Sequence, residues 1–218
     1  MTLKLNGSSS GSVSIDAPAS TTGGADITFA LPVADGSSGQ ALTTNASGAL
    51  SFATVGQPIT SGTYTSVGTS THVDITVDST DVVKYDIMFA NVSSAGGTDW
   101  MFQIGDSGGI ETSGYSNAAM YFSNSSYGST SFRSDSWRWR STSDATFVMD
   151  GRFTLTRING NIWYGDGILN RNETGDGTLY TMCGKKELSG ALTTIQISAS
   201  SDDSQNFDNG HFKLITYK

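Results

Sequence analysis

One short stretch of the sequence matches the surroundings of a catalytic serine. Residues 105–109 read Gly-Asp-Ser-Gly-Gly, the string that carries the nucleophile in chymotrypsin-like proteases. That chemistry needs a histidine base oriented by a buried carboxylate, together with backbone amides that bind the oxyanion. The chain has 2 histidines, and His72 lies 35 residues before Ser107 inside an alternating strand pattern. We therefore interpret residues 105–109 as a glycine-rich turn after a strand, and we expect no catalytic residues.

A second stretch could bind a ligand. Residues 137–140 read Trp-Arg-Trp-Arg. On a strand, the two tryptophans would share one face and the two arginines the other. Tryptophans on the core with arginines at the surface is one interpretation. The other is functional, because exposed tryptophans would stack on a sugar ring and exposed arginines would pair with acidic glycans. The alternation leaves open which face meets water.

The segment that precedes these tryptophans is long and polar. Residues 105–136 are rich in Ser, Gly and Asn, and three tyrosines lie among them. This composition is typical of recognition loops, in which Tyr supplies contact area and Ser and Gly supply adaptability. Long segments of this kind are often functional, although a plain connection between strands has the same composition. The candidate glycan contacts are Tyr115, Tyr121, Tyr127, Trp137 and Trp139.

Metal and thiol chemistry find little support. Acidic residues cluster at 78–81, 172–176 and 202–208, but none of the clusters has the spacing of a calcium-binding EF-hand loop. Two distant histidines make a weak zinc site. Cys183 is the only cysteine, so the chain can form no internal disulfide, and its setting favours a small buried side chain. We expect no metal and no cofactor.

The elements that position these residues are predicted to be strands. The chain has 26 Gly, 3 Pro and only 15% charged residues, a composition typical of β-rich proteins with many turns. Apolar residues alternate in short runs separated by Gly, Asn, Asp and Ser. The predicted strands are residues 72–77, 83–92, 100–104, 118–122, 131–140, 146–157, 179–183, 192–198 and 211–217. Their number and spacing favour a jelly-roll-like antiparallel β-sandwich head over residues 63–218.

Charge and hydropathy restrict the partners. The net charge of −8 lacks the basic footprint that binding to nucleic acid requires, and it disfavours an anionic membrane surface. The sequence has no apolar run of 18 residues and no signal-peptide pattern at its start. We therefore expect a protein made in the cytoplasm that does not insert into a membrane.

The first 55 residues cannot form a domain by themselves. Of the 10 Phe, 8 Tyr and 4 Trp residues, only Phe29 and Phe52 precede residue 56. Apolar faces of two or three residues bury too little area to offset the entropy of ordering the chain. We expect residues 1–55 to form a stem that orders when identical copies wrap around each other, followed by a linker at 56–62. The predicted interchain core is Ile15, Ile27, Phe29, Leu31, Leu42, Leu50 and Phe52.

Particular motifs of this N-terminal region resemble a known family. They are Leu-Asn-Gly-Ser at 5–8, Leu-Pro at 31–32, Gly-Gln-Ala-Leu-Thr-Thr-Asn at 39–45, and Gly-Ala-Leu-Ser-Phe at 48–52. Together they resemble the stem repeat of bacteriophage tail fibres and related virion proteins, particularly those of marine phages. The match covers about a quarter of the chain. The closing run Phe-Asp-Asn-Gly-His-Phe-Lys-Leu at 207–214 is similar to the last strand of many fibre heads.

The resemblance implies a homotrimeric, non-enzymatic virion protein with an all-β fold. Its short trimeric stem would dock to other virion proteins, and its head would bind a host surface glycan or receptor. The chain is shorter than long tail fibres, so the mounting site is open among the tail hub, the tip of a larger fibre and the capsid. The rivals are a capsid decoration protein or head fibre and, in a different class, a carbohydrate-active enzyme or lectin.

Overall fold

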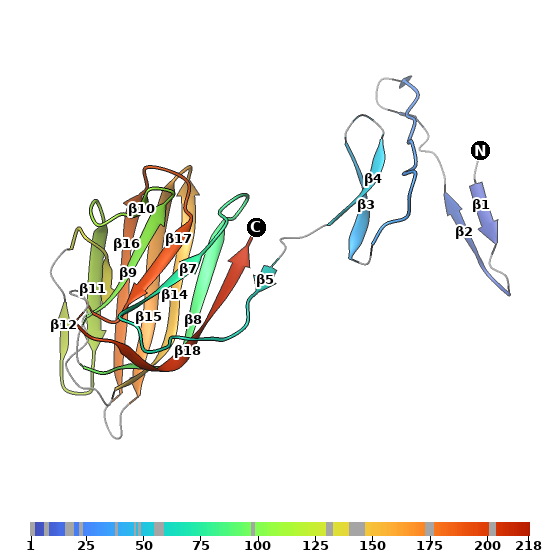
Figure 1. The fold of residues 1–218 in the computed structure, drawn as a ribbon. Coiled ribbons are helices and arrows are strands. Elements are labelled where there is room, and N and C mark those ends of the chain that lie inside the picture. The colour runs from blue at the N-terminus through green and yellow to red at the C-terminus, as the bar shows by residue number, and fades with distance from the viewer. Residues whose placement is uncertain are drawn as a thin grey trace. The chain divides into compact units, whose positions relative to one another are not determined.

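The protein consists of β-strands arranged in two compact units. In the computed structural model (Figure 1), these units are Met1–Gly56 and Gln57–Lys218. The described residues are 3–6, 9–15, 20–21, 24–37, 39–45, 47, 49–54, 59–96, 99–129, 133–139, 147–172, 177–200 and 204–218. They form strands, as predicted from the composition, and every pair of these strands is antiparallel. Within the part of the chain that the structure describes, no helix has the length and apolar character needed to cross a membrane.

The N-terminal unit contains two small hairpins. Strand β1 (Leu3–Asn6) pairs with β2 (Ser12–Ile15), and β3 (Gln40–Thr44) pairs with β4 (Leu50–Thr54). The turn between β3 and β4 is organised by Asn45, whose side-chain Oδ1 accepts hydrogen bonds from the backbone N–H groups of Ser47 and Ala49 at 2.9 and 3.1 Å. Asparagine favours such turns because its side chain replaces a backbone acceptor. In the segment 24–37, which precedes β3, Ala30 forms a parallel bridge with Ala49, the residue before β4.

The larger sheet of the head runs in the order β12-β11-β16-β15-β14-β8-β18-β5, and β6 also pairs with β18. Its strands are β5 (Ile59–Ser61), β6 (Thr65–Ser66), β8 (Lys84–Ser94), β11 (Ser116–Phe122), β12 (Tyr127–Ser129), β14 (Val148–Asn159), β15 (Ile162–Asn172), β16 (Thr178–Glu187) and β18 (Phe207–Tyr217). Because β5 pairs with the last strand, part of the predicted linker belongs to the head.

The smaller sheet lies against the larger one and closes the core (Figure 1). Its order is β10-β9-β17-β7, and β13 pairs with β9 on the same edge as β10. The strands are β7 (His72–Thr76), β9 (Trp100–Asp106), β10 (Gly109–Ile110), β13 (Trp137–Trp139) and β17 (Thr194–Ser198). Residues with alternating spacing point inward from both sheets, and the rings of Phe102 and Phe153 lie 4.3 Å apart between them.

The strand pairing of the head is that of a jelly roll with insertions. The first strands, β5 and β6, pair with the last strand, β18, while β7 pairs with β17, β8 with β14 and β9 with β13. This nested pairing of strands from opposite ends of the domain is what two Greek keys produce. The hairpins β11–β12 and β15–β16 extend the larger sheet beyond β14. The predicted sandwich is confirmed.

One long strand of the larger sheet does not appear among the predicted strands. The dipeptide Asp166-Gly167 is typical of a turn, but it lies in the middle of β15. Gly165 and Gly167 face the core, where a Cβ at Gly165 would lie 2.7 Å from Trp137 Cε2, and one at Gly167 would overlap the Trp139 ring. The two glycines are present because the tryptophans of the opposite sheet need the space.

Other dipeptides that are typical of turns lie in different settings. Gly160 and Asn161 do form the two-residue connection between β14 and β15, and Gly160 has the positive φ of 51° that favours glycine. Residues 150–151 and 209–210 instead lie within strands, at irregularities in the pairing with β8. At these two positions the dipeptides Asp-Gly and Asn-Gly therefore mark bulges within strands rather than reversals of the chain.

Candidate ligand-binding surfaces of the head

Three of the five predicted glycan contacts lie in the core. Tyr115, Trp137 and Trp139 are 2%, 0% and 1% exposed, so the prediction that they contact a surface ligand is wrong. The Tyr115 ring lies edge-on to Trp137 at 5.0 Å, and its hydroxyl accepts a hydrogen bond from Ile104 N at 2.8 Å. These side chains are buried because alternation places both tryptophans of β13 on the inner face of the smaller sheet.

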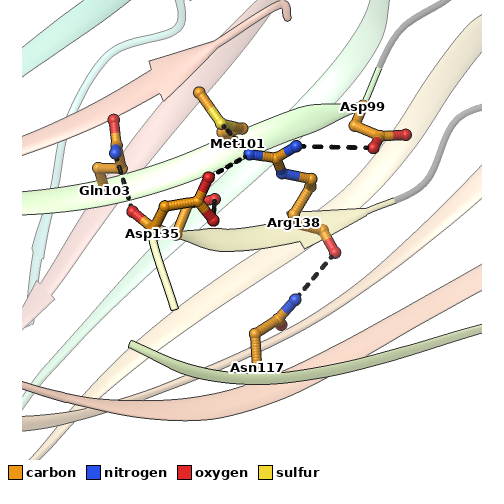
Figure 2. A network of polar contacts seen from close by, with 7 residues as sticks. Asp99, Met101, Gln103, Asn117, Asp135 and Arg138 are labelled. Atoms are coloured by element: carbon orange, nitrogen blue, oxygen red, sulfur yellow. Dashed lines mark hydrogen bonds and ion pairs between the residues drawn. The ribbon is translucent and has the colours of Figure 1, made fainter. Parts of the chain in front are cut away.

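The arginine between the tryptophans is buried as well. Arg138 points to the outer face of the smaller sheet but is only 7% exposed, which corrects the expectation of a surface arginine. Figure 2 shows its guanidinium between two carboxylates: Nη2 donates to Asp135 Oδ2 at 2.7 Å, and Nη1 lies 3.9 Å from Asp99 Oδ2. Nη2 also contacts Met101 Sδ at 3.1 Å. The positive charge is therefore neutralised within the fold and is not offered to an acidic ligand. Arg140 lies outside the described residues.

This network borders a groove on the outer face of the smaller sheet. The groove has a volume of about 340 Å³ and is lined by Met101, Gln103, Ile110, Thr112, Asp135, Gln196 and Ser198. Pairing of β9 with β17 places Gln103 opposite Gln196 and Met101 opposite Ser198, so these four side chains form the floor. The hairpin β9–β10 and the residues before β13 form the sides.

The two glutamines of the floor are held by their nitrogens. Gln103 Nε2 donates to the backbone oxygen of Asp135 at 2.9 Å, and Figure 2 shows its Oε1 directed away from that contact. Gln196 Nε2 donates to Asp74 Oδ1 at 2.8 Å. Since both nitrogens are engaged, each side chain presents its oxygen as a hydrogen-bond acceptor. The Asp135 side chain is 44% exposed and adds a carboxylate at the rim.

Tyr121 contributes to a separate pocket at the end of the larger sheet. This pocket has a volume of about 220 Å³ and is lined by Tyr121, Ser123, Ser125, Ser126, Arg171, Thr178 and Tyr180. The rings of Tyr121 and Tyr180 lie 6.2 Å apart, and a Cβ at Gly128 would overlap the Tyr121 ring. Arg171 Nη1 donates to the Tyr180 hydroxyl at 3.3 Å.

Tyr127 lies on the neighbouring strand and is 81% exposed. It pairs in register with Phe122 on β11. Successive residues of β11 face opposite sides of the sheet, so Phe122, next to Tyr127, shares the outer face, whereas Tyr121 points toward the sandwich interior. The structure therefore divides the five predicted contacts among the core, an end pocket and an exposed position, and does not bring them together.

The described residues assemble no catalytic triad around Ser107. The turn at residues 107–108 connects β9 to β10, as predicted, and Asp106 Oδ1 accepts a hydrogen bond from Gly108 N at 2.7 Å. His72 aligns through Ser198 with Met101, six residues along β9 from Ser107. At the strand rise this separates the two residues by about 20 Å. His211 lies in the other sheet, and in the described part of the chain no three His, Cys, Asp or Glu side chains gather as a metal site requires.

The floor of the groove is not evident in the sequence because its members are far apart in the chain. Gln103 and Gln196 become neighbours only when β9 pairs with β17. A weak signal is present, since each glutamine interrupts an otherwise apolar strand sequence, Trp-Met-Phe-Gln-Ile and Ile-Gln-Ile.

Cys183, for which the sequence favours burial, is exposed on β16.

Comparison of the chain with known protein families, with curated proteins and with solved structures finds no match in any of the three. The function is therefore inferred from the geometry of the chain itself.

Proposed function

We propose that the chain is a structural protein of a bacteriophage virion: a short homotrimeric tail fibre or spike whose N-terminal unit attaches it to the particle. The head then displays a binding surface toward a glycan of the host cell. The observation that carries this proposal is the exposure of large apolar side chains in the N-terminal unit, which a single copy leaves in water.

These side chains follow one another along the extended segment before β3. Ile27, Phe29 and Leu31 are 59%, 59% and 75% exposed, and Leu42 on β3 is 49% exposed. Complete burial of such a side chain contributes about 1.5–3 kcal/mol, so covering four of them is worth several kcal/mol per chain. All four belong to the predicted interchain core. The side chain of Ile15 lies outside the described part of β2.

The remaining two members of that core border an open apolar groove. Leu50 and Phe52 are half-buried, and together with residues 30–35 they line a space of about 460 Å³. A neighbouring copy can fill this space with its own exposed side chains. When identical chains associate closely, each N-terminal unit can insert its exposed apolar side chains into the groove of one neighbour. Its own groove can hold the side chains of another.

The head has its own apolar surface on the outer face of the larger sheet. Met120, Phe122, Ile168 and Leu179 lie on adjacent strands and are each 39–45% exposed. Strand register places Phe122 beside Leu179, with Met120 and Ile168 on either side of Thr181. Grouped apolar side chains of this kind mark contact surfaces more often than isolated ones. In a trimer, a neighbouring head supplies the cover.

The same features favour an adhesin over an enzyme. The groove beside Arg138 is open and rich in acceptors, and neither histidine lies near the only serine that resembles a nucleophile. A hydrolase would need a convergent acid and base of matched pKa.

Purified particles of a phage that encodes the chain provide the test. Antibodies raised against residues 57–218 are expected to decorate the tail in negative-stain electron microscopy. Decoration of the capsid would support the alternative of a capsid decoration protein or head fibre. Absence of the chain from purified particles, established by mass spectrometry, would contradict a role in the virion.

A further inference from the structure

We propose that the groove between Asp135 and the β9–β17 strand pair is a binding site for a neutral saccharide. This inference deepens the proposed function, on which it rests only in assuming that the head binds a glycan. It also replaces the tryptophans of β13 as the basis for sugar recognition, since both of them are buried.

The polar atoms of the groove call for a ligand rich in hydrogen-bond donors. Gln103 and Gln196 each engage their nitrogen with the protein and leave Oε1 without a partner among the described contacts. Gln103 is 7% exposed and Gln196 is half-buried, so both oxygens lie in the floor of the groove at positions that solvent reaches. Sugar hydroxyls placed over the floor would donate hydrogen bonds to both oxygens in place of water.

The apolar atoms of the groove fit the other surface of a sugar. Met101 and Ile110 are the apolar members of the lining and offer aliphatic contact for the C–H bonds of a pyranose ring. A volume of about 340 Å³ is at the small end of the roughly 300–1,000 Å³ range of ligand sites, which suits a short saccharide.

The charges of the groove exclude an acidic sugar. Its rim carries the carboxylate of Asp135, and its described lining contains no Lys or Arg. The guanidinium of Arg138, which pairs with Asp135 at the rim, is held between Asp135 and Asp99 and is buried. A uronic or sialic acid would meet the Asp135 carboxylate in a lining that supplies no cation, against a net protein charge of −8. The ligand class is therefore neutral hexoses and N-acetylhexosamines.

Rigid support of the floor favours binding without rearrangement. Each glutamine amide is anchored by one hydrogen bond, and the two strands that carry them are central to the smaller sheet. A site in which the acceptors are already oriented loses little entropy when the ligand arrives.

Saturation-transfer NMR on the full chain tests the proposal. The probes are methyl glycosides of glucose, galactose, mannose, N-acetylglucosamine and N-acetylgalactosamine, with glucuronic and N-acetylneuraminic acid glycosides as the acidic set. At least one neutral glycoside is expected to receive saturation, and the acidic set is not. Gln103→Met and Gln196→Met keep side-chain volume and remove the acceptor, so each is expected to weaken the affinity for that glycoside about tenfold.

Two control substitutions establish that binding belongs to this groove. Gln205→Met changes a glutamine outside the groove and is expected to leave binding intact, as is Tyr127→Ala on β12. The melting temperature of each variant is measured as well. Only variants that melt at the same temperature as the native protein are compared, so that a loss of binding does not reflect unfolding. A preference for the acidic glycosides, full binding by both groove variants, loss of binding in Tyr127→Ala, or no saturation of any neutral glycoside would each overturn the proposal. None of these outcomes bears on trimer formation, which is measured independently by sedimentation.

Discussion

Two aspartates on the outer face of the larger sheet flank the same threonine, and their pKa values are shifted in opposite directions. Thr154 on β14 pairs in register with Asp86 on β8 and with Asp166 on β15. Burial alone would raise the pKa of Asp86, but hydrogen bonds from Lys84, Thr154 and Tyr217 hold it below its ordinary value. Burial raises the pKa of Asp166, and repulsion from Asp86 adds to that rise against the attraction of Arg152.

The Asp86 carboxylate is therefore predicted to stabilise the fold at neutral pH. Because its pKa is lower in the folded state than in the unfolded chain, its contribution is complete above the unfolded pKa, near 4, and disappears as the pH falls through the folded pKa. Asp86→Asn weakens three hydrogen bonds to a charged acceptor, and we expect a loss of about 2–3 kcal/mol at pH 7. Urea denaturation of the head at pH 7 and pH 3 measures this, and the difference between variant and native protein should shrink at the lower pH.

Asp166→Asn is the matched comparison on the other side of Thr154, where the ionised carboxylate is expected to affect folding stability with the opposite sign. A raised pKa in the folded state means that the native protein binds the proton more tightly than the unfolded chain, so ionisation at neutral pH opposes folding. The variant is expected to be as stable as the native protein at pH 7 or more stable. Equal destabilisation by the two substitutions in denaturant titrations would show that burial, and not charge, governs both positions.

At the scale of the strand, the central element is β15, whose glycines accommodate the tryptophans of β13. Gly167→Ala introduces a methyl group into the space that the Trp139 ring occupies, and overpacking of this kind costs about 1–3 kcal/mol. The control is Gly177→Ala, because a Cβ there meets nothing within 4 Å. Thermal unfolding should separate the two variants clearly. Similar melting temperatures would mean that the tryptophans are not seated against β15.

Strand β15 also shows which parts of the fold the sequence pattern predicts and which it misses. Alternating apolar residues correctly predict most strands of the head, because each faces a dry core on one side. The pattern fails at β15, where Gly165, Asp166 and Gly167 are typical of a turn. The two glycines are instead required by the rings of Trp137 and Trp139, which lie nearly 30 residues earlier in the chain. The groove is missed for a similar reason: Gln103 and Gln196 become neighbours only through strand pairing. In the stretch at 137–139, both faces of β13 are buried, which alternation alone does not indicate.

At the scale of the whole chain, the N-terminal unit and the head differ in how they are stabilised. The head has a continuous core with large side chains that are completely buried, among them Trp137, Phe153 and Leu155. The N-terminal unit has two small hairpins and leaves Phe29 and Leu31 in water. A two-stranded hairpin without a covered face is marginal by itself, so the stem is expected to depend on association.

Substitutions in the stem should therefore affect assembly and spare the head. Phe29→Ser combined with Leu31→Ser removes two exposed apolar side chains, and we expect it to dissociate the oligomer. The head should keep its melting temperature, because its core lies within residues 57–218. Asp26→Ser is the control in the same extended segment. Size-exclusion chromatography with light scattering reads out both variants, and an unchanged oligomer in the double variant would place the subunit contacts elsewhere.

Sedimentation equilibrium of the full chain asks whether each stem is stabilised by other copies of itself. The chain mass is 22.9 kDa, and we expect a single species of three times that mass across micromolar concentrations. A species at the mass of one chain, independent of concentration and with an ordered stem, would show that the N-terminal unit needs no partner copy.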